Sequence, residues 1–185
     1  MAGHYAEIVR TLRFWFEEAG REAWFKGGPG FDALCRERLA DLHGQAAAGA
    51  HDAWAGTPEG SLALCILLDQ VPRNIFRGTA RAFATDARAL EVARAALERG
   101  FDQGMREEQR VFLYLPFEHS ESLEDQRTAV RLFAGRTVDP LWLDYACRHL
   151  AVIHRYGRFP HRNAALGRET TAAEAAWLAM PDSGF

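Results

Sequence analysis

The segment from Thr57 to Val71 constrains the fold more than any other part of the sequence. It reads TPEGSLALCILLDQV, and its threonine followed by proline is the order that starts many helices. Beyond the first turn this helix would be apolar on every side. Because a helix without a polar face must be covered by other elements, the segment is expected at the centre of the core. The chain is therefore expected to surround it with further helices.

Most of the remaining sequence also has the helical period. Apolar residues recur at helical spacing in the segments 6–18, 32–49, 85–99, 106–115, 122–135 and 139–157, and no stretch keeps the two-residue alternation of a strand. The glycines and proline of Phe25–Phe31 predict a loop, and Thr171 with Glu174 predicts a capping box for a last helix. We expect an all-α protein of about eight or nine helices, forming a single domain over residues 1–185.

Composition limits the kinds of partner. The 185 residues are 48% hydrophobic and 25% charged, which is typical of globular proteins, and the net charge of −3 gives no basic footprint for nucleic acid or acidic membranes. The N-terminus has no apolar signal segment, and the longest apolar run, Leu62–Leu68, is too short to span a bilayer. We expect a soluble cytoplasmic protein; whether it forms a homo-oligomer stays open.

Neither the cysteines nor the histidines form a familiar metal motif. Cys35, Cys65 and Cys147 are far apart, without a C-x-x-C pair, and lie among apolar residues. Buried, reduced thiols are the expected state. The sequence also lacks H-E-x-x-H, and the arginines around its histidines oppose a cation. No metal or other cofactor is expected.

Three prolines divide the chain at equal intervals. Pro72, Pro116 and Pro160 are separated by 44 residues each, follow an apolar residue, and are predicted to end helices. The first and third are followed by matching motifs, R-N-x-x-x-G at Arg73–Gly78 and at Arg162–Gly167. A period of this length is typical of helical-hairpin repeats, so a compact tetratricopeptide-like array is predicted. Since equivalent positions of stacked repeats share one side, the polar residues beside the prolines should converge.

These polar residues make up the candidate site. Asp69 ends an apolar helix, where its charge meets the negative end of the helix dipole and requires a cationic partner. His119 lies near two carboxylates, which favour its protonated form. Arg and Asn side chains near Pro72 and Pro160 donate hydrogen bonds of the kind that hold an anion. The candidate ligand-binding residues are Asp69, Arg73, Asn74, Glu118, His119, Glu121, His149, Arg158, His161, Arg162 and Asn163.

Two histidines and one serine need separate interpretation. His149 falls on the apolar face of the helix 139–157, so it is either a hydrogen-bonded core histidine or the wall of a polar pocket. His154 lies off that face and is expected at the rim or in solvent. Ser120 lacks the G-x-S-x-G context of a hydrolase nucleophile and is better explained as a helix cap.

Three long segments resemble a bacterial family. They are LDQVPRNIFRGTARAFATDARAL at 68–90, FLYLPFEHSESLEDQ at 112–126 and HRYGRFPHRNAALGRETTAAE at 154–174. With the aromatic pairs near the N-terminus, they resemble a family of proteins of unknown function. The resemblance implies a compact tetratricopeptide-like helical fold and one polar centre, without an established activity. The family pattern includes Asp86, Asp125 and Gln126 beside the candidate site residues, and it leaves out His154.

Three functions remain open. The first is binding of a small anionic ligand, or of an acidic or C-terminal peptide, in the Arg/His/Asn site. The second is catalysis by a hydrolase or lyase, with His119 or His161 as acid or base together with Glu118 or Glu121. The third is a scaffold in which the polar clusters only lock helices together.

Overall fold

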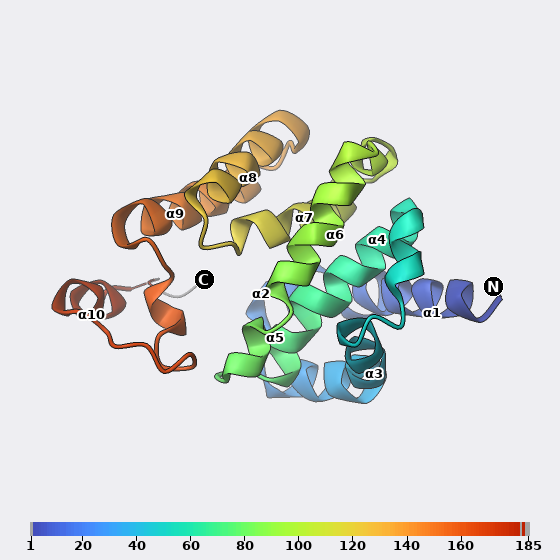
Figure 1. The fold of residues 1–185 in the computed structure, drawn as a ribbon, viewed down its shortest axis with the longest axis horizontal. Helices are drawn as coiled ribbons and strands as arrows, with labels where there is room; N and C mark the ends of the chain where they lie inside the picture. Colours follow the sequence, from blue (N-terminus) through green and yellow to red (C-terminus); the bar gives the residue numbers. More distant parts are fainter. Residues whose placement is uncertain (1, 182, 184–185) are drawn as a thin grey trace.

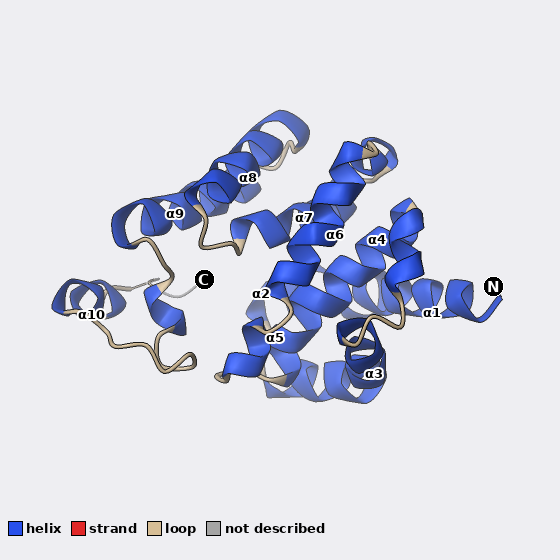
Figure 2. Cartoon of the chain, in the orientation of Figure 1, coloured by secondary structure: helices blue, strands red, loops and turns tan. Residues whose placement is uncertain are grey.

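A computed structural model describes residues 2–181 and 183, and every regular element in this part of the chain is a helix. Figure 2 shows helices joined by short loops, with no strand among the described residues. The all-α prediction is confirmed. The α-helices are α1 (Ala2–Arg13), α2 (Gly20–Lys26), α3 (Pro29–Ala47), α4 (Pro58–Cys65), α5 (Val71–Ile75), α6 (Asp86–Glu98), α7 (Glu107–Glu118), α8 (Leu123–Arg136), α9 (Pro140–Tyr156) and α10 (Ala172–Leu178).

The apolar segment predicted to be central is the buried axis of the fold. Helix α4 starts as expected: the Thr57 hydroxyl accepts a hydrogen bond from the backbone N–H of Gly60 at 3.1 Å. It continues through a π-helical turn, Ile66–Gln70, directly into α5. Helices α1, α6 and α7 pack against α4, and α3 packs against α5 (Figure 1). This enclosure explains why a helix without a polar face is stable here.

The prediction that three helices end at the prolines is wrong for two of them. Pro72 is the second residue of α5 but lies inside a helix that continues from α4, and the backbone oxygen of Leu68, four residues before it, accepts from the Thr85 hydroxyl. Pro116 lies inside the last turn of α7, which continues to Glu118. Only near Pro160 has a helix already ended: Gly157, with φ of 69°, closes α9 in the left-handed conformation.

The N-terminal part is more continuous than the sequence indicated. Instead of a helix over 6–18 and a loop over 25–31, α1 passes through a π-helical turn, Phe14–Ala19, into α2. The break shrinks to Gly27 and Gly28, whose φ angles of 54° and 112° suit glycine, and α3 begins at Pro29. Asp32, in the first turn of α3, pairs with Arg77.

The C-terminal part folds back beside the helices that precede it. From α6 to α9 each helix packs against the next in the chain, and beyond α9 the chain turns through a short 3₁₀ helix, Pro160–Arg162, to α10 (Figure 1). A small core of its own, formed by Val152, Ile153 and Phe159, anchors this segment. The described helices include none that is both long and apolar enough to cross a membrane.

The cysteine prediction holds for two of three residues. Cys35 and Cys65 are buried, but Cys147 is exposed on α9. It lies off the face that carries Trp142, Ala146 and His149, all of which are buried. The apolar neighbours of Cys147 in sequence therefore point elsewhere, because a helix distributes adjacent residues over different faces.

Candidate functional site

A cavity of about 470 Å³ lies where α2, α5, α7 and α9 meet the turn Pro160–Arg162. It brings together polar residues from all three proline-flanked segments. Of the eleven candidates, Asp69 lies directly behind the wall through His119, whereas Glu121, Arg158 and Asn163 do not line the cavity. The candidates in the wall are Arg73, Asn74, Glu118, His119, His149, His161 and Arg162.

Asp69 is the buried anchor of the polar wall. Both of its carboxylate oxygens accept from Nδ1 of His119, at 2.8 and 2.9 Å, and Nη1 of Arg73 lies 3.0 Å from Oδ1. Gln70 adds a further hydrogen bond of 2.6 Å. Burial opposes ionisation of this carboxyl group, but Arg73 and His119 more than offset that effect, so the pKa of Asp69 lies below its ordinary value. Asp69 is therefore an ionised, fully enclosed carboxylate, with the cationic partner that its helix position required.

His119 presents its other nitrogen to the cavity. With Nδ1–H donating to Asp69, Nε2 of a neutral ring carries the lone pair, and it has no hydrogen-bond partner among the described residues. Burial and the nearby Arg73 cation lower the pKa of His119, although Asp69 opposes the change. The predicted protonated form is therefore not favoured, because desolvation outweighs the carboxylate.

Two arginines from matching motifs meet at Asp86. Arg73 holds that carboxylate with two hydrogen bonds of 2.8 and 2.9 Å, and Arg162 reaches the same group at 3.2 Å. Both guanidinium groups also lie over the ring of Phe83, and the motif glycines, Gly78 and Gly167, both have left-handed φ angles of 77° and 64°. The R-N-x-x-x-G match in the sequence thus corresponds to two turns that converge on one carboxylate.

Arg162 is the less compensated of the two arginines. It is 6% exposed, and its other hydrogen bond goes to the backbone oxygen of His119 at 3.0 Å. Its Nε has no acceptor among the described residues. Burial and the like charge of Arg73 lower the pKa of Arg162 to about 10, whereas Asp69 and Asp86 raise that of Arg73. The cation at Arg162 is therefore less favourable than in water.

Glu118 and His149 form a neutral pair in the same wall. Nδ1 of His149 lies 3.1 Å from Glu118 Oε1 and 2.9 Å from the backbone oxygen of Tyr145. Burial, aided by the charge of Asp69, raises the pKa of Glu118 to about 8, and burial lowers that of His149. For His161, burial and Arg162 lower the pKa to about 4. At pH 7 the cavity thus holds a protonated carboxyl group and neutral imidazoles. His149 meets both descriptions that the sequence left open, since it is buried and hydrogen-bonded to Tyr145 and also lines the cavity.

Aromatic side chains that the sequence did not single out also line the cavity. Trp24, Phe83, Phe133, Trp142 and Tyr145 line it together with leucines. A signal was available for two of them, because Trp142 and Tyr145 share the helical face of His149 at spacings of seven and four residues. The other three come from segments far apart in sequence, which only the folded chain brings together.

The candidates outside the cavity hold the C-terminal segment in place. We call Glu121, Arg158, Asn163, Arg168 and Glu174 the C-terminal clamp. Glu121 accepts two hydrogen bonds from Arg168, at 2.7 and 3.0 Å, and Glu174 accepts two from Arg158, at 2.7 and 2.9 Å. Asn163 accepts from Arg168 at 3.0 Å. The clamp thereby fixes the turn that carries His161 and Arg162 into the cavity.

Ser120 and His154 take the positions expected for residues without a chemical role. The Ser120 hydroxyl donates to Asp125 at 2.7 Å and accepts from the backbone N–H of Ser122 at 3.2 Å, which ties down the start of α8. His154 is exposed on α9. The Ser120 hydroxyl therefore has a structural role in these two hydrogen bonds and does not line the cavity.

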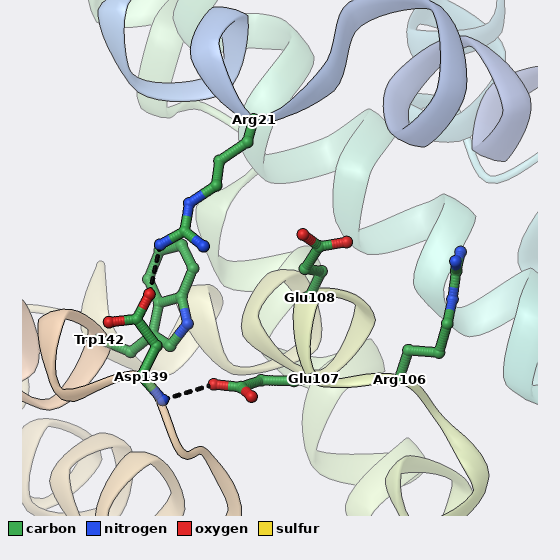
Figure 3. A pocket seen from close by; sticks show the side chains of 6 residues that line it. All are labelled: Arg21, Arg106, Glu107, Glu108, Asp139 and Trp142. Atoms are coloured by element: carbon green, nitrogen blue, oxygen red, sulfur yellow. Dashed lines mark hydrogen bonds and ion pairs between the residues drawn. The ribbon is translucent and has the colours of Figure 1, made fainter.

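A second, smaller hollow of about 280 Å³ shares only Trp142 with the cavity. Figure 3 shows Arg21 paired with the carboxylate of Asp139. It also shows Glu107, whose carboxylate accepts a hydrogen bond of 2.9 Å from the backbone N–H of Asp139. Asp139 in turn caps α9 by accepting from the amide of Leu141 at 3.0 Å. These charges hold the start of α9, and none of the candidate site residues lies there.

Within the described part of the chain, no three His, Cys, Asp or Glu side chains are grouped so that they could hold a metal ion. Comparison with known families gives a match over residues 11–182 to the family described as "Bacterial protein of unknown function (DUF924)". The chain belongs to this family. The resemblance found in the sequence is thereby confirmed.

A solved structure supports the same relationship. The protein of unknown function ATU0120 from Agrobacterium tumefaciens is 43% identical to this chain, covers 96% of it and 98% of its own length, and superposes with a TM-score of 0.87. Comparison with curated proteins gives no match. Family membership thus establishes the fold and leaves the function to be argued from the cavity.

Proposed function

We propose that this DUF924 family member binds a small organic acid whose carboxylate lies against Arg162 and whose apolar body packs against the aromatic residues of the cavity. The observation that carries the proposal is the state of Arg162. A guanidinium group has five N–H donors, and that of Arg162 makes two hydrogen bonds to described residues. A buried cation with a lowered pKa gains more from an added anion than one that is already paired.

The composition of the wall supports an acid with an apolar body over a simple inorganic anion. Ligand cavities of 300–1,000 Å³ typically combine apolar walls with a few convergent polar groups. This cavity, of about 470 Å³, is lined by Arg162, His119 and Glu118 and also by rings such as Trp142. Phosphate would pair with the polar groups only and leave the aromatic rings without a contact.

The charge of the polar wall supports a monoanion over a dianion. Arg73 and Arg162 are opposed by the carboxylates of Asp69 and Asp86, and Glu118 is protonated at neutral pH. The wall is therefore close to neutral before a ligand binds. One negative charge is stabilised by the N–H groups of Arg162 and by the Glu118 proton. A second would lack a cation of its own, because the other cations of the lining, Lys26 and Arg77, are already paired with Glu22 and Asp32.

A thermal-shift series tests the proposal. Phenylacetate and hexanoate are compared with acetate, phosphate and a short peptide ending in phenylalanine. At about 100 times its Kd a ligand stabilises the folded state by about 2.7 kcal/mol, which raises the Tm of a chain of this size by about 5–10 °C. We expect such a shift with phenylacetate or hexanoate, and little with acetate or phosphate.

Two variants make the result specific to Arg162. Arg162→Ala should abolish the shift, whereas Arg127→Ala, which removes an exposed arginine of α8, should keep it. Equal shifts in wild type and Arg162→Ala would place binding elsewhere and refute the proposal. A response to the peptide alone would favour peptide recognition, and a response to none of the probes would favour the scaffold function.

A further inference from the structure

We infer that Asp69 and His119 form a general-base pair that hydrolyses esters or amides of the acid bound in this cavity. The inference rests on the proposed function, because it takes the bound acid to be the product of the reaction. Asp69 acts as a positioning residue behind the imidazole, and His119 is the catalytic residue. Four side chains take part: His119, Glu118 and Arg162 in the cavity wall, and Asp69 directly behind it.

The first step is the orientation of His119. Both oxygens of Asp69 lie within 2.9 Å of Nδ1, so the proton of a neutral ring is held on that nitrogen and the lone pair is on Nε2. A carboxylate that fixes an imidazole in this tautomer leaves it ready to accept a proton. A purely structural partner for Asp69 is already supplied by Arg73, at 3.0 Å. The imidazole adds a basic nitrogen on the cavity side.

The second step is the absence of a suitable serine. Ser120 follows His119 directly, but its hydroxyl donates to Asp125 and does not line the cavity. The other lining residues include no serine, threonine or cysteine. A base without a neighbouring nucleophilic side chain acts on water, so direct hydrolysis is favoured over a covalent intermediate.

The third step is a proton donor close to the base. Glu118 is the residue before His119, its carboxyl group lies 3.1 Å from Nδ1 of His149, and the His149 and His119 rings are 6.1 Å apart. Buried beside Asp69, Glu118 keeps its proton up to a pKa of about 8. A neutral acid and a neutral base in one wall are the two groups that hydrolysis requires at neutral pH.

The reaction balances with water as the only co-substrate. His119 Nε2 takes a proton from water while the water oxygen bonds to the acyl carbon, and Arg162 donates hydrogen bonds to the developing oxyanion. The bond from the acyl carbon to the leaving oxygen or nitrogen then breaks, and Glu118 gives its proton to that atom. An alcohol or amine leaves, the acid remains against Arg162, and the His119 proton passes through water to Glu118.

The charges around His119 predict a bell-shaped pH profile. Titratable and charged groups face His119 from four directions. Asp69 and Arg73 belong to the segment Ile66–Ile75, and Glu118 is the neighbour of His119 in sequence. His149 lies on α9, and His161 and Arg162 lie in the 3₁₀ turn. Activity should fall in acid as His119 becomes protonated and in base, near pH 8, as Glu118 loses its proton.

Hydrolysis of 4-nitrophenyl phenylacetate and of the 4-nitroanilide of phenylacetic acid tests the inference. We expect turnover by wild type, inhibition by phenylacetate, and a loss of at least about 100-fold in His119→Gln, in line with the usual contribution of a general base. His154→Gln, which removes an exposed histidine of α9, is the matched control and should keep full activity. Asp69→Asn should lower the rate and move the acid limb of the profile to lower pH, a change that a merely structural residue would not cause.

Binding and hydrolysis are measured on the same variants, so their failures can be told apart. Circular dichroism and the phenylacetate thermal shift show whether His119→Gln folds and still binds. If wild type binds phenylacetate but hydrolyses neither probe faster than His119→Gln, the inference is wrong and the proposed binding stands. If wild type neither binds nor hydrolyses, both are wrong.

Discussion

The cavity and the C-terminal clamp use the same kinds of side chain but pair them differently. In the clamp each arginine meets one carboxylate through two hydrogen bonds, Arg168 with Glu121 and Arg158 with Glu174. In the cavity wall two arginines and a histidine share the carboxylates of Asp69 and Asp86. The clamp is complete in itself, whereas Arg162 in the wall makes only two hydrogen bonds to described residues.

The difference shows why an arginine-rich motif is not by itself a binding site. Arg158 and Arg162 are four residues apart, and the sequence placed both among the candidates. Arg158 turns toward α10 and is satisfied there, whereas Arg162 turns into the cavity and shares Asp86 with Arg73. The completeness of its pairing is therefore what distinguishes Arg162 from Arg158.

The largest effect is expected from removing Asp69. Asp69→Ala deprives Arg73 and His119 of a buried carboxylate and should lower the free energy of unfolding by about 3–5 kcal/mol. In the clamp, Glu121→Ala should cost about 1–3 kcal/mol, because Glu121 and Arg168 are only partly buried and water can replace the lost partner. Urea unfolding of both variants measures the difference. An Asp69→Ala cost no greater than that of Glu121→Ala would contradict the central role given to Asp69.

A smaller effect is expected from the pH dependence that Glu118 confers. Its carboxyl group is ionised in the unfolded chain above about pH 4.5 but stays protonated in the folded protein up to a pKa of about 8. The folded state thus holds one more proton, so the free energy of unfolding falls as pH rises. Between pH 6.5 and 8 the fall should be roughly 1–2 kcal/mol, since one pH unit corresponds to about 1.4 kcal/mol per proton.

Matched variants assign that slope to Glu118. Glu118→Gln should flatten it, because an amide does not titrate, whereas Glu124→Gln, at an exposed position of α8, should leave it as in wild type. Urea unfolding at pH 6.5 and 8 gives the slope for each protein. An unchanged slope in Glu118→Gln would mean that Glu118 ionises normally. The proposed hydrolysis would then lack its proton donor at neutral pH.

Much of the fold could be predicted from local signals. The helical period, the Thr57 cap, the Thr171 capping box and the Gly157 terminator are each contained in a few neighbouring residues, and the structure has all of them. The continuation of helices past Pro72 and Pro116 could not be predicted in this way. Tertiary packing of the buried axis stabilises those turns despite the missing amide hydrogen bonds.

The site was only partly predictable for a related reason. The repeated motif indicated that Arg73 and Arg162 lie in similar environments. It did not indicate that both donate hydrogen bonds to the Asp86 carboxylate. Pairing depends on partners distant in sequence: Arg168 reaches Glu121 from 47 positions away. A single sequence therefore shows which residues are able to form a site, and only the folded chain shows which of them are already used.

The smallest effect on stability is expected at Arg162, and it is the sharpest test of the contrast. Arg162→Met should change the free energy of unfolding by less than about 1 kcal/mol, because the lost hydrogen bonds are offset by removal of a cation that burial and Arg73 disfavour. The same substitution in the clamp, Arg168→Met, should cost about 1–3 kcal/mol, since it leaves Glu121 without its charge partner. Urea unfolding of the pair, with and without phenylacetate, separates stability from binding. If Arg162→Met keeps the wild-type free energy of unfolding but loses the response to phenylacetate, Arg162 serves binding more than folding. If the variant loses several kcal/mol, Arg162 is a structural residue like the arginines of the clamp, and the proposed binding group is refuted.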